Sequence, residues 1–198
     1  MRFGIHVPKQ RDLPATARYA AEIRCETIQI FSGNPMSWSV GSVGPDERDA
    51  FIGEKDAAGI GPVLVHTPYL INLATPDRKL QSLSLRALVG ALTRSAELAS
   101  GPAVVHCGNH MGAGPGKGME RAVRMIRRAL ESAPENAVLA VENGAGKGTE
   151  IGVDAAELAE IVGPFPEDRV GIVLDTAHLW AMGHDLRGNL TEKDRPGS

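Results

Sequence analysis

The chain is poor in several features that mark particular classes of protein. Of its 198 residues only Cys25 and Cys107 are cysteines, and aromatic residues make up 4%. Two cysteines build no disulfide framework and suit a reducing cytoplasm, while so few aromatics argue against broad surfaces that stack bases. No apolar run approaches the roughly 20 residues that cross a bilayer, and the N-terminus lacks a signal-peptide pattern. We therefore expect a cytoplasmic protein without a membrane segment.

The chain also lacks a positive charge balance. Its formal net charge of −3 argues weakly against nucleic acid as a partner, because phosphate-binding proteins usually carry a positive face. Bound metal ions would remove this objection, since a dication outweighs nearby side chains. The hydrophobic content of 42% is enough for one sizeable core and predicts one domain over residues 1–198.

Short β-branched runs alternate with longer helical patterns, which predicts an α/β fold with a parallel sheet. The predicted strands are Arg2–Val7, Thr27–Phe31, Pro62–Val65, Ala103–Val105, Ala137–Val141 and Val170–Leu174. The predicted helices lie near Pro14–Arg24, Pro45–Ala58, Pro76–Ala99, Met119–Glu131 and Val153–Val162. Six strand–helix steps fit either a doubly wound sheet or part of a closed (β/α) barrel. A complete barrel takes about 250 residues and eight strands, so a barrel here would be incomplete, with about six of eight βα units.

Two helix starts show capping patterns, and one helix shows a clear apolar face. Thr75 before Pro76 predicts an N-cap, and Asp154 with Glu157 resembles a capping box. The apolar face of the fourth predicted helix consists of Met119, Ala122, Val123, Ile126 and Leu130.

Ligand-type side chains follow nearly every predicted strand. They are His6, His66, His106, Glu142, Asp175 and His178. Because parallel strands joined by helices point their C-terminal ends to one rim, we expect these residues to converge there. Imidazole nitrogens and carboxylate oxygens are zinc-type ligands. The sequence therefore predicts metal binding by His66, His106, Glu142, Asp175 and His178, whereas His6 fits a supporting or a packing role equally well.

Four local sequences, taken together, indicate a family. His66-Thr67-Pro68-Tyr69-Leu70-Ile71-Asn72-Leu73-Ala74, His106-Cys107-Gly108-Asn109-His110, Val141-Glu142-Asn143-Gly144-Ala145-Gly146-Lys147-Gly148 and Leu174-Asp175-Thr176-Ala177-His178 occur in this order. They resemble the endonuclease IV family of apurinic/apyrimidinic endonucleases, which shares its barrel with sugar isomerases. The resemblance implies up to three zinc ions and cleavage of double-stranded DNA on the 5′ side of an abasic site.

The resemblance also assigns roles to individual residues. It implies that His66, His106 and Glu142 hold one zinc, that Glu142 bridges to a second zinc with Asp175, and that His178 binds the third. Glu142 is thus the predicted catalytic residue, because a bridging carboxylate fixes the spacing of two cations that stabilise the attacking and leaving oxygens.

Two loops are candidates for contact with DNA. Tyr69 and Leu70 follow His66 and match a family loop that wedges into the duplex where the base is missing. Asn34 and Met36 lie in a second such loop, in which many relatives carry an arginine where this chain has Met36. Methionine still wedges between bases but supplies no charge. Lys117 and Lys147, in glycine-rich loops, are further candidates for phosphate contacts.

The family's remaining ligands, expected on two further strand loops, do not appear after His178. We therefore expect a truncated chain or one that a second polypeptide or oligomer completes, with one complete zinc site and weak or no endonuclease activity. Two alternatives stay open: a sugar-phosphate isomerase or epimerase that uses a single metal, and a non-catalytic zinc- or DNA-binding remnant.

Overall fold

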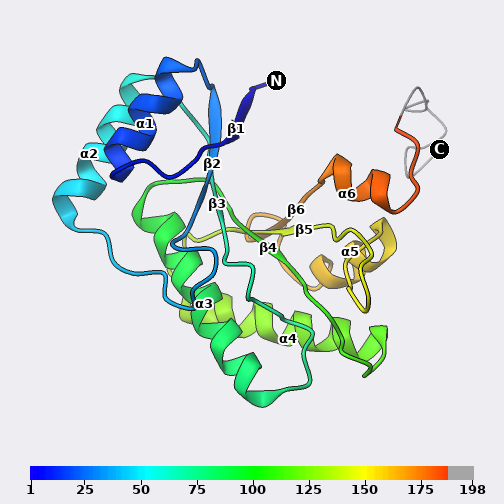
Figure 1. Cartoon of the computed structure of the whole chain (residues 1–198). Helices are drawn as coiled ribbons and strands as arrows, with labels where there is room; N and C mark the ends of the chain where they lie inside the picture. The colour runs from blue at the N-terminus through cyan, green and yellow to red at the C-terminus, as the bar shows by residue number, and fades with distance from the viewer. Residues whose placement is uncertain (187–198) are drawn as a thin grey trace.

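The computed structural model describes residues 1–186, in which strands and helices alternate along the chain (Figure 1). The strands are β1 (Gly4–His6), β2 (Thr27–Phe31), β3 (Val63–His66), β4 (Ala103–His106), β5 (Leu139–Glu142) and β6 (Val170–Val173). The helices are α1 (Leu13–Glu22), α2 (Pro45–Ala57), α3 (Arg78–Glu97), α4 (Pro115–Ser132), α5 (Ala155–Val162) and α6 (Thr176–Ala181). The α/β alternation expected from the sequence is confirmed.

The strands form one parallel sheet in the order β1-β2-β3-β4-β5-β6, so every strand pairs with its neighbour in the sequence. Sequential order with helical crossovers is the arrangement of a (β/α) barrel and not of a doubly wound sheet. Within residues 1–186, β1 pairs only with β2 and β6 only with β5, so these six strands form an incomplete barrel. The incomplete barrel expected from the sequence is therefore confirmed.

The register of the sheet aligns the ends of neighbouring strands. Phe31 pairs with His66 across β2 and β3, and His106 pairs with Glu142 across β4 and β5. Because all strands are parallel, these residues lie at the same C-terminal edge of the sheet. The register therefore brings together side chains from four strands that are far apart in the sequence.

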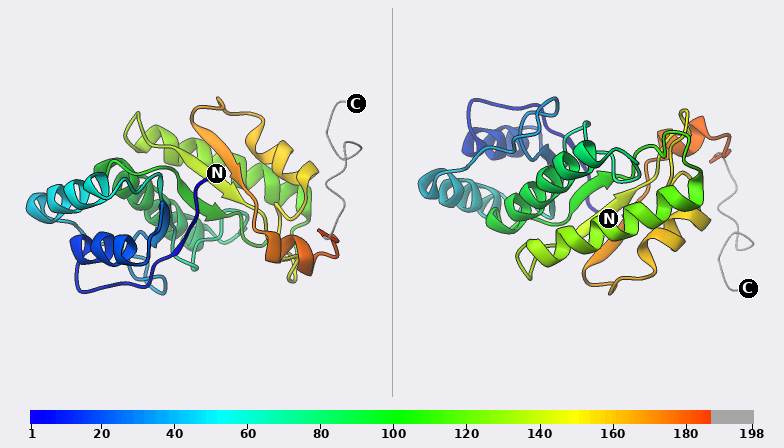
Figure 2. Two further views of the ribbon diagram at one scale, coloured as in Figure 1. Left: turned by 90° about the horizontal axis from the view of Figure 1, so that it is seen from above. Right: turned by 90° about the horizontal axis from the view of Figure 1, so that it is seen from below.

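The helices pack around the outside of the curved sheet and bury two clusters of apolar side chains. Figure 2 shows α1 and α2 at one end of the molecule and α5 and α6 at the other. The larger cluster joins α3, α4 and α5 to β4–β6 and includes Leu88, Leu92, Ile126 and Leu139, all fully buried. The smaller cluster packs α1 and α2 on β2 and β3 around Phe51, and Val7, directly after β1, joins it. The apolar face expected for α4 is confirmed at Met119, Ala122 and Ile126.

The two predicted helix caps have different outcomes. At α5, Asp154 Oδ1 accepts a hydrogen bond from the Glu157 amide, and Glu157 Oε2 accepts from the amides of Gly152 and Val153, so the capping box is confirmed in variant form. The prediction that Thr75 caps α3 is wrong. The N-cap is Asp77, whose carboxylate accepts from the Leu80 amide, while the Thr75 hydroxyl accepts from the Asp77 amide in a turn before the helix.

We also find that no helix within residues 1–186 combines the length and the apolar character needed to span a membrane.

Candidate metal centre

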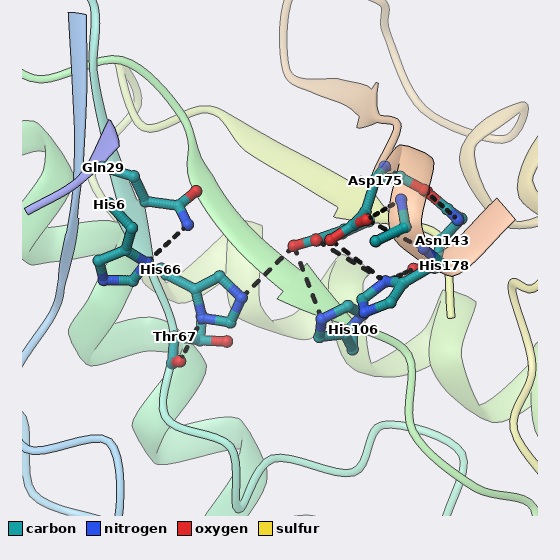
Figure 3. A network of polar contacts seen from close by, with 10 residues as sticks. His6, Gln29, His66, Thr67, His106, Asn143, Asp175 and His178 are labelled. Atoms are coloured by element: carbon teal, nitrogen blue, oxygen red, sulfur yellow. Dashed lines mark hydrogen bonds and ion pairs between the residues drawn. The ribbon is translucent and has the colours of Figure 1, made fainter. Parts of the chain in front are cut away.

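Five ligand-type side chains meet at the C-terminal edge of the sheet, as the sequence predicts. His66, His106 and Glu142 are the last residues of β3, β4 and β5. Asp175 is the N-cap of α6, and His178 lies in the first turn of that helix. Potential ligand atoms of these residues lie within 4.8 Å of one another in two groups that share Glu142 (Figure 3).

The first ligand group consists of His66, His106 and Glu142. Nε2 of His66 lies 3.4 Å from Glu142 Oε2, and Nε2 of His106 lies 3.6 Å from the same oxygen. His66 and Glu142 are buried, with 6% and 8% of their surface exposed, and His106 is half-buried. Two imidazoles and one carboxylate whose ligand atoms lie this close together form a group that could hold a metal ion.

The second ligand group consists of Glu142, Asp175 and His178. His178 Nδ1 lies 3.6 Å from Asp175 Oδ2 and 4.0 Å from Glu142 Oε1. Glu142 therefore directs one oxygen toward each group. Asp175 and His178 are both more exposed than His66, so the second group lies at the open side of the site.

Backbone carbonyls fix the orientation of two imidazole rings. His66 Nδ1 donates to the Thr67 carbonyl at 2.7 Å, and His178 Nδ1 donates to the Asn143 carbonyl at 2.9 Å. A carbonyl oxygen only accepts, so Nδ1 of each ring carries the hydrogen and Nε2 keeps its lone pair when the ring is neutral. Metal-binding histidines are usually held in this way. The His66 ring therefore faces Glu142 with the nitrogen that keeps its lone pair, as a metal ligand requires, whereas His178 faces the second group with Nδ1, the nitrogen that is bonded to the Asn143 carbonyl.

Asn143 connects the two strands that carry the second ligand group. Its side chain is fully buried; Oδ1 accepts from the Asp175 amide at 2.7 Å, and Nδ2 donates to the Asp175 carbonyl at 3.2 Å. Asp175 Oδ1 in turn accepts from the amides of Ala177 and His178, which leaves Oδ2 free to face the His178 ring. Sequence reasoning assigned no specific role to Asn143, although an asparagine directly after a predicted ligand is a usable signal.

The pKa shifts favour the ligand forms of these side chains. Burial lowers the pKa of His106, against the opposing effect of the Glu142 carboxylate. For Asp175, burial acts to raise the pKa, but the amide hydrogen bonds from His178 and Ala177, together with the nearby His178 ring, outweigh it and lower the pKa. His106 is therefore neutral and Asp175 is charged at neutral pH, as metal coordination requires.

A cavity of about 220 Å³ lies beside the two ligand groups and is lined by His66, His106 and His178. Loop residues complete its walls, among them Tyr69, Asn109, Lys147 and Glu150. Glu150 accepts a hydrogen bond from the Lys147 amide at 2.8 Å, which holds the β5–α5 loop in place. Sequence reasoning missed Glu150 because it does not lie at the end of a strand.

The predicted DNA-contact residues differ in exposure. The side chains of Tyr69 and Met36 are 62% and 68% exposed, whereas Leu70 is half-buried. The Tyr69 ring packs edge-on against His66, with 5.9 Å between centroids, and its amide donates to the Pro35 carbonyl at 3.0 Å. Asn34 is exposed, and its Oδ1 accepts from the Met36 amide, so this oxygen stabilises the turn. The two predicted loops thus lie in contact at the edge of the site.

Two further residues at the strand ends stay outside the ligand groups. The His6 ring lies 6.2 Å from the His66 ring, and its Nδ1 pairs with the Gln29 side chain at 2.9 Å, so His6 packs beside the site (Figure 3). Cys107 is buried, and this burial raises the pKa of its thiol to about 12. A thiol with so high a pKa is not a nucleophile at neutral pH.

Comparisons with known proteins identify the family to which the chain is similar. The family described as "Xylose isomerase-like TIM barrel" matches residues 17–197. "Probable endonuclease 4" of Methanoculleus marisnigri is 42% identical over 186 residues, which cover 93% of this chain and 66% of that protein. The protein of the same name from Natranaerobius thermophilus is 37% identical and covers 94% of this chain. The chain thus spans about 66% of the length of these curated relatives.

A solved structure has a similar fold. The crystal structure of endonuclease IV from Thermus thermophilus superimposes with a TM-score of 0.77 at 30% identity, over 91% of this chain and 65% of that chain. The six strands and the helices between them therefore belong to an architecture that is known from experiment.

Proposed function

Since the chain belongs to the endonuclease IV family of xylose isomerase-like TIM barrels, we propose that it is a zinc-dependent endonuclease that cleaves the phosphodiester bond 5′ to abasic sites in double-stranded DNA. Its role would be base excision repair. The observation that carries this proposal is the convergence of five ligand-type side chains in two groups that share Glu142.

The donor set fits zinc. His66, His106 and Glu142 would hold one ion, and Glu142 with Asp175 and His178 would contribute to further ones. Bound zinc would supply positive charge that activates a water molecule near neutral pH and stabilises the negative charge of the reacting phosphodiester. The residues of the chain position these ions: Thr67 and Asn143 orient two imidazoles, and the Asp175 carboxylate is fixed by the start of α6.

The rim of the site supports a DNA substrate. Tyr69 is exposed but held in position, because its ring packs against the rings of His66 and Phe31 and its amide donates a hydrogen bond to the Pro35 carbonyl. An exposed aromatic side chain beside a metal site is suited to fill the space of a missing base. Met36, next to it on the β2–α2 loop, offers a second apolar wedge. A sugar-phosphate isomerase would have no use for such a protruding pair, which makes that alternative less well supported.

The proposal is tested with the zinc-loaded 198-residue protein and two matched duplexes, one with a single abasic site and one intact. We expect tighter binding to the abasic duplex and slow nicking on its 5′ side. Chelation of the metal and Glu142→Gln should each abolish nicking, because Glu142 serves both ligand groups. The Glu142→Gln variant keeps the side-chain shape, so circular dichroism should show an unchanged fold.

Four outcomes would count against the proposal or change it. Equal binding to both duplexes without nicking would refute it. Turnover of a ketose phosphate by the same preparation would favour a sugar-phosphate isomerase or epimerase, and one bound zinc without selective binding would indicate a non-catalytic remnant. A zinc content near three would show that a second polypeptide or a second copy contributes ligands.

A further inference from the structure

Positive charge is concentrated on two neighbouring helices of an otherwise acidic chain. Residues 78–132, which span α3 and α4, contain nine Lys and Arg against three Asp and Glu, a formal excess of six positive charges. The whole chain carries −3, so the remaining residues carry a formal −9. The helices α3 and α4 lie next to each other on the outside of the sheet (Figure 2, right). The charge separation is therefore a separation in space.

On α4 the cations form a stripe. Lys117, Arg121, Arg124 and Arg128 follow one another at intervals of four, three and four residues, which places them on one face of a helix. Lys117, Arg124 and Arg128 are exposed and Arg121 is half-buried. On α3, Arg78, Lys79 and Arg86 are also exposed. We call these seven residues the α3–α4 basic face.

Within residues 1–186, none of the seven side chains forms an ion pair with a carboxylate within 4.0 Å. Elsewhere on the surface, Arg18 pairs with Glu54 and Arg48 with Asp49. Glu120 and Glu131 lie near the stripe on α4 and reduce its charge without pairing with it. A set of close, unpaired cations repels itself, and a polyanion would relieve this repulsion.

The basic face begins at the metal centre. Both helices start at the rim that carries the ligand groups, and Arg121 donates to the carbonyl of Ala74 in the β3–α3 loop, the loop that also presents Tyr69. From Lys117, in the first turn of α4, the stripe extends 11 residues to Arg128, which is about 16 Å at 1.5 Å per residue. Double-stranded DNA carries roughly ten phosphates over the same length.

From this arrangement we propose that the α3–α4 basic face binds the phosphate backbone of DNA outside the cleavage site, so that the footprint extends from the rim along α4. This inference rests on DNA as the substrate in the proposed function, but not on the metal chemistry. It also answers the objection that a net charge of −3 argues against nucleic acid as a partner, because a local positive surface is enough to bind a duplex.

The test measures how the affinity of the zinc-loaded protein for an undamaged duplex of about 30 base pairs depends on salt concentration. We compare the protein with a variant that combines Arg124→Gln and Arg128→Gln. Glutamine has nearly the helix propensity of arginine, so α4 should persist. The control combines Arg18→Gln and Arg24→Gln, which removes two exposed cations at the α1–α2 end of the molecule.

Each lost phosphate contact makes the slope of log binding constant against log salt concentration shallower by about 0.9. We therefore expect the slope of the α4 variant to be shallower by about two, and the slope of the control to equal that of the unchanged protein. Equal slopes for all three proteins would overturn the proposal. So would binding of poly-glutamate as tight as that of the duplex at equal charge, because the face would then be a site for acidic polypeptides.

The undamaged duplex contains no abasic site, so the two proposals fail separately. If the slope changes but abasic DNA is not nicked, the endonuclease proposal is refuted and the proposal for the basic face is supported. If abasic DNA is nicked and the slopes are equal, the basic-face proposal is refuted and the endonuclease proposal is supported.

Discussion

The two ligand groups share Glu142 but differ in how firmly the fold holds them. The first group lies on the ends of three adjacent strands in the middle of the sheet, where β4 and β5 are buried by α3, α4 and α5. The second group depends on β6, which is an edge strand within residues 1–186, and on α6, a helix of six residues none of which is buried. A metal ligand is effective when the structure holds it in place before the ion arrives. The first group should therefore be the stronger site.

The loops that support the two groups differ in the same way. Behind the first group, Asn72 Oδ1 accepts hydrogen bonds from the amides of Ala74 and Asn109 and so joins the β3–α3 loop to the β4–α4 loop. Beside the second group, Gly146 in the β5–α5 loop contacts the side chain of Met182, which follows α6. The first contact uses the side-chain amide of Asn72, which two hydrogen bonds hold in place, and the second uses the flexible thioether of Met182. We expect the difference to appear in metal affinity, in stability and in pH dependence.

The largest expected effect concerns zinc affinity. His106→Gln removes a ligand of the first group only, and His178→Gln removes a ligand of the second group only. We expect His106→Gln to weaken the tightest zinc site by more than the about 10–100-fold that loss of an outer hydrogen-bond partner costs, whereas His178→Gln should retain about one tightly bound ion. Titration of metal-free protein with zinc in the presence of a competing chelator measures both.

His184 lies outside both ligand groups, so His184→Gln is the matched control and should bind zinc as the unchanged protein does. Equal loss of affinity in the His106 and His178 variants would show that the two groups act as one indivisible site, and the proposed ranking would be wrong.

An intermediate effect is expected for stability. Gly108 has a φ of +83°, and a Cβ there would lie 2.5 Å from Asn72 Oδ1 and 2.8 Å from the Asn72 backbone. Gly108→Ala should thus cost at least about 1–2 kcal/mol from the left-handed conformation alone, plus the overlap with Asn72. At Gly146 the φ is +73°, and a Cβ would overlap only the flexible Met182 side chain. Gly146→Ala should cost less.

Urea unfolding of both metal-free variants measures these costs. If Gly146→Ala destabilises the protein as much as Gly108→Ala, the loop beside the second group is as rigid as the loop behind the first, and the comparison between the groups loses its basis.

The sequence predicted most of the fold because the hydrophobic period and the turn and capping residues agree along much of the chain. β2 was predicted without error at Thr27–Phe31, and α2 to within one residue. The start of α4 was missed because Gly116 and Gly118 are poor helix formers, although Pro115 at the first position favours a helix start. α6 was missed because six residues are too few to show a helical period.

The site followed from the parallel sheet, since residues at the C-terminal ends of its strands must lie near each other. What the sequence could not predict is the set of contacts that orient the ligands. The carbonyls of Thr67 and Asn143 bind imidazole nitrogens only because the backbone turns there, and Glu150 reaches the site from the middle of a loop. Such contacts depend on backbone conformation rather than on residue type, so no local pattern indicates them.

The smallest expected effect concerns pH. Burial lowers the pKa of His106 from its ordinary value of 6.5, so in the metal-free folded protein this ring resists protonation more than in the unfolded chain. As the pH falls below 6.5, the unfolded state takes up a proton that the folded state does not, and stability decreases until the pH reaches the lowered pKa. Above pH 6.5 the protonation of this ring should not change the free energy of unfolding with pH. Urea unfolding at several pH values from about 7 to about 5 should therefore show a shallower decline in stability for His106→Gln than for the unchanged protein.

Since Asp175 of the second group has a lowered pKa, its carboxylate stays charged over this range, and Asp175→Asn should leave the decline in stability unaltered. A decline that Asp175→Asn flattens and His106→Gln does not would reverse the assignment of the pH-sensitive group.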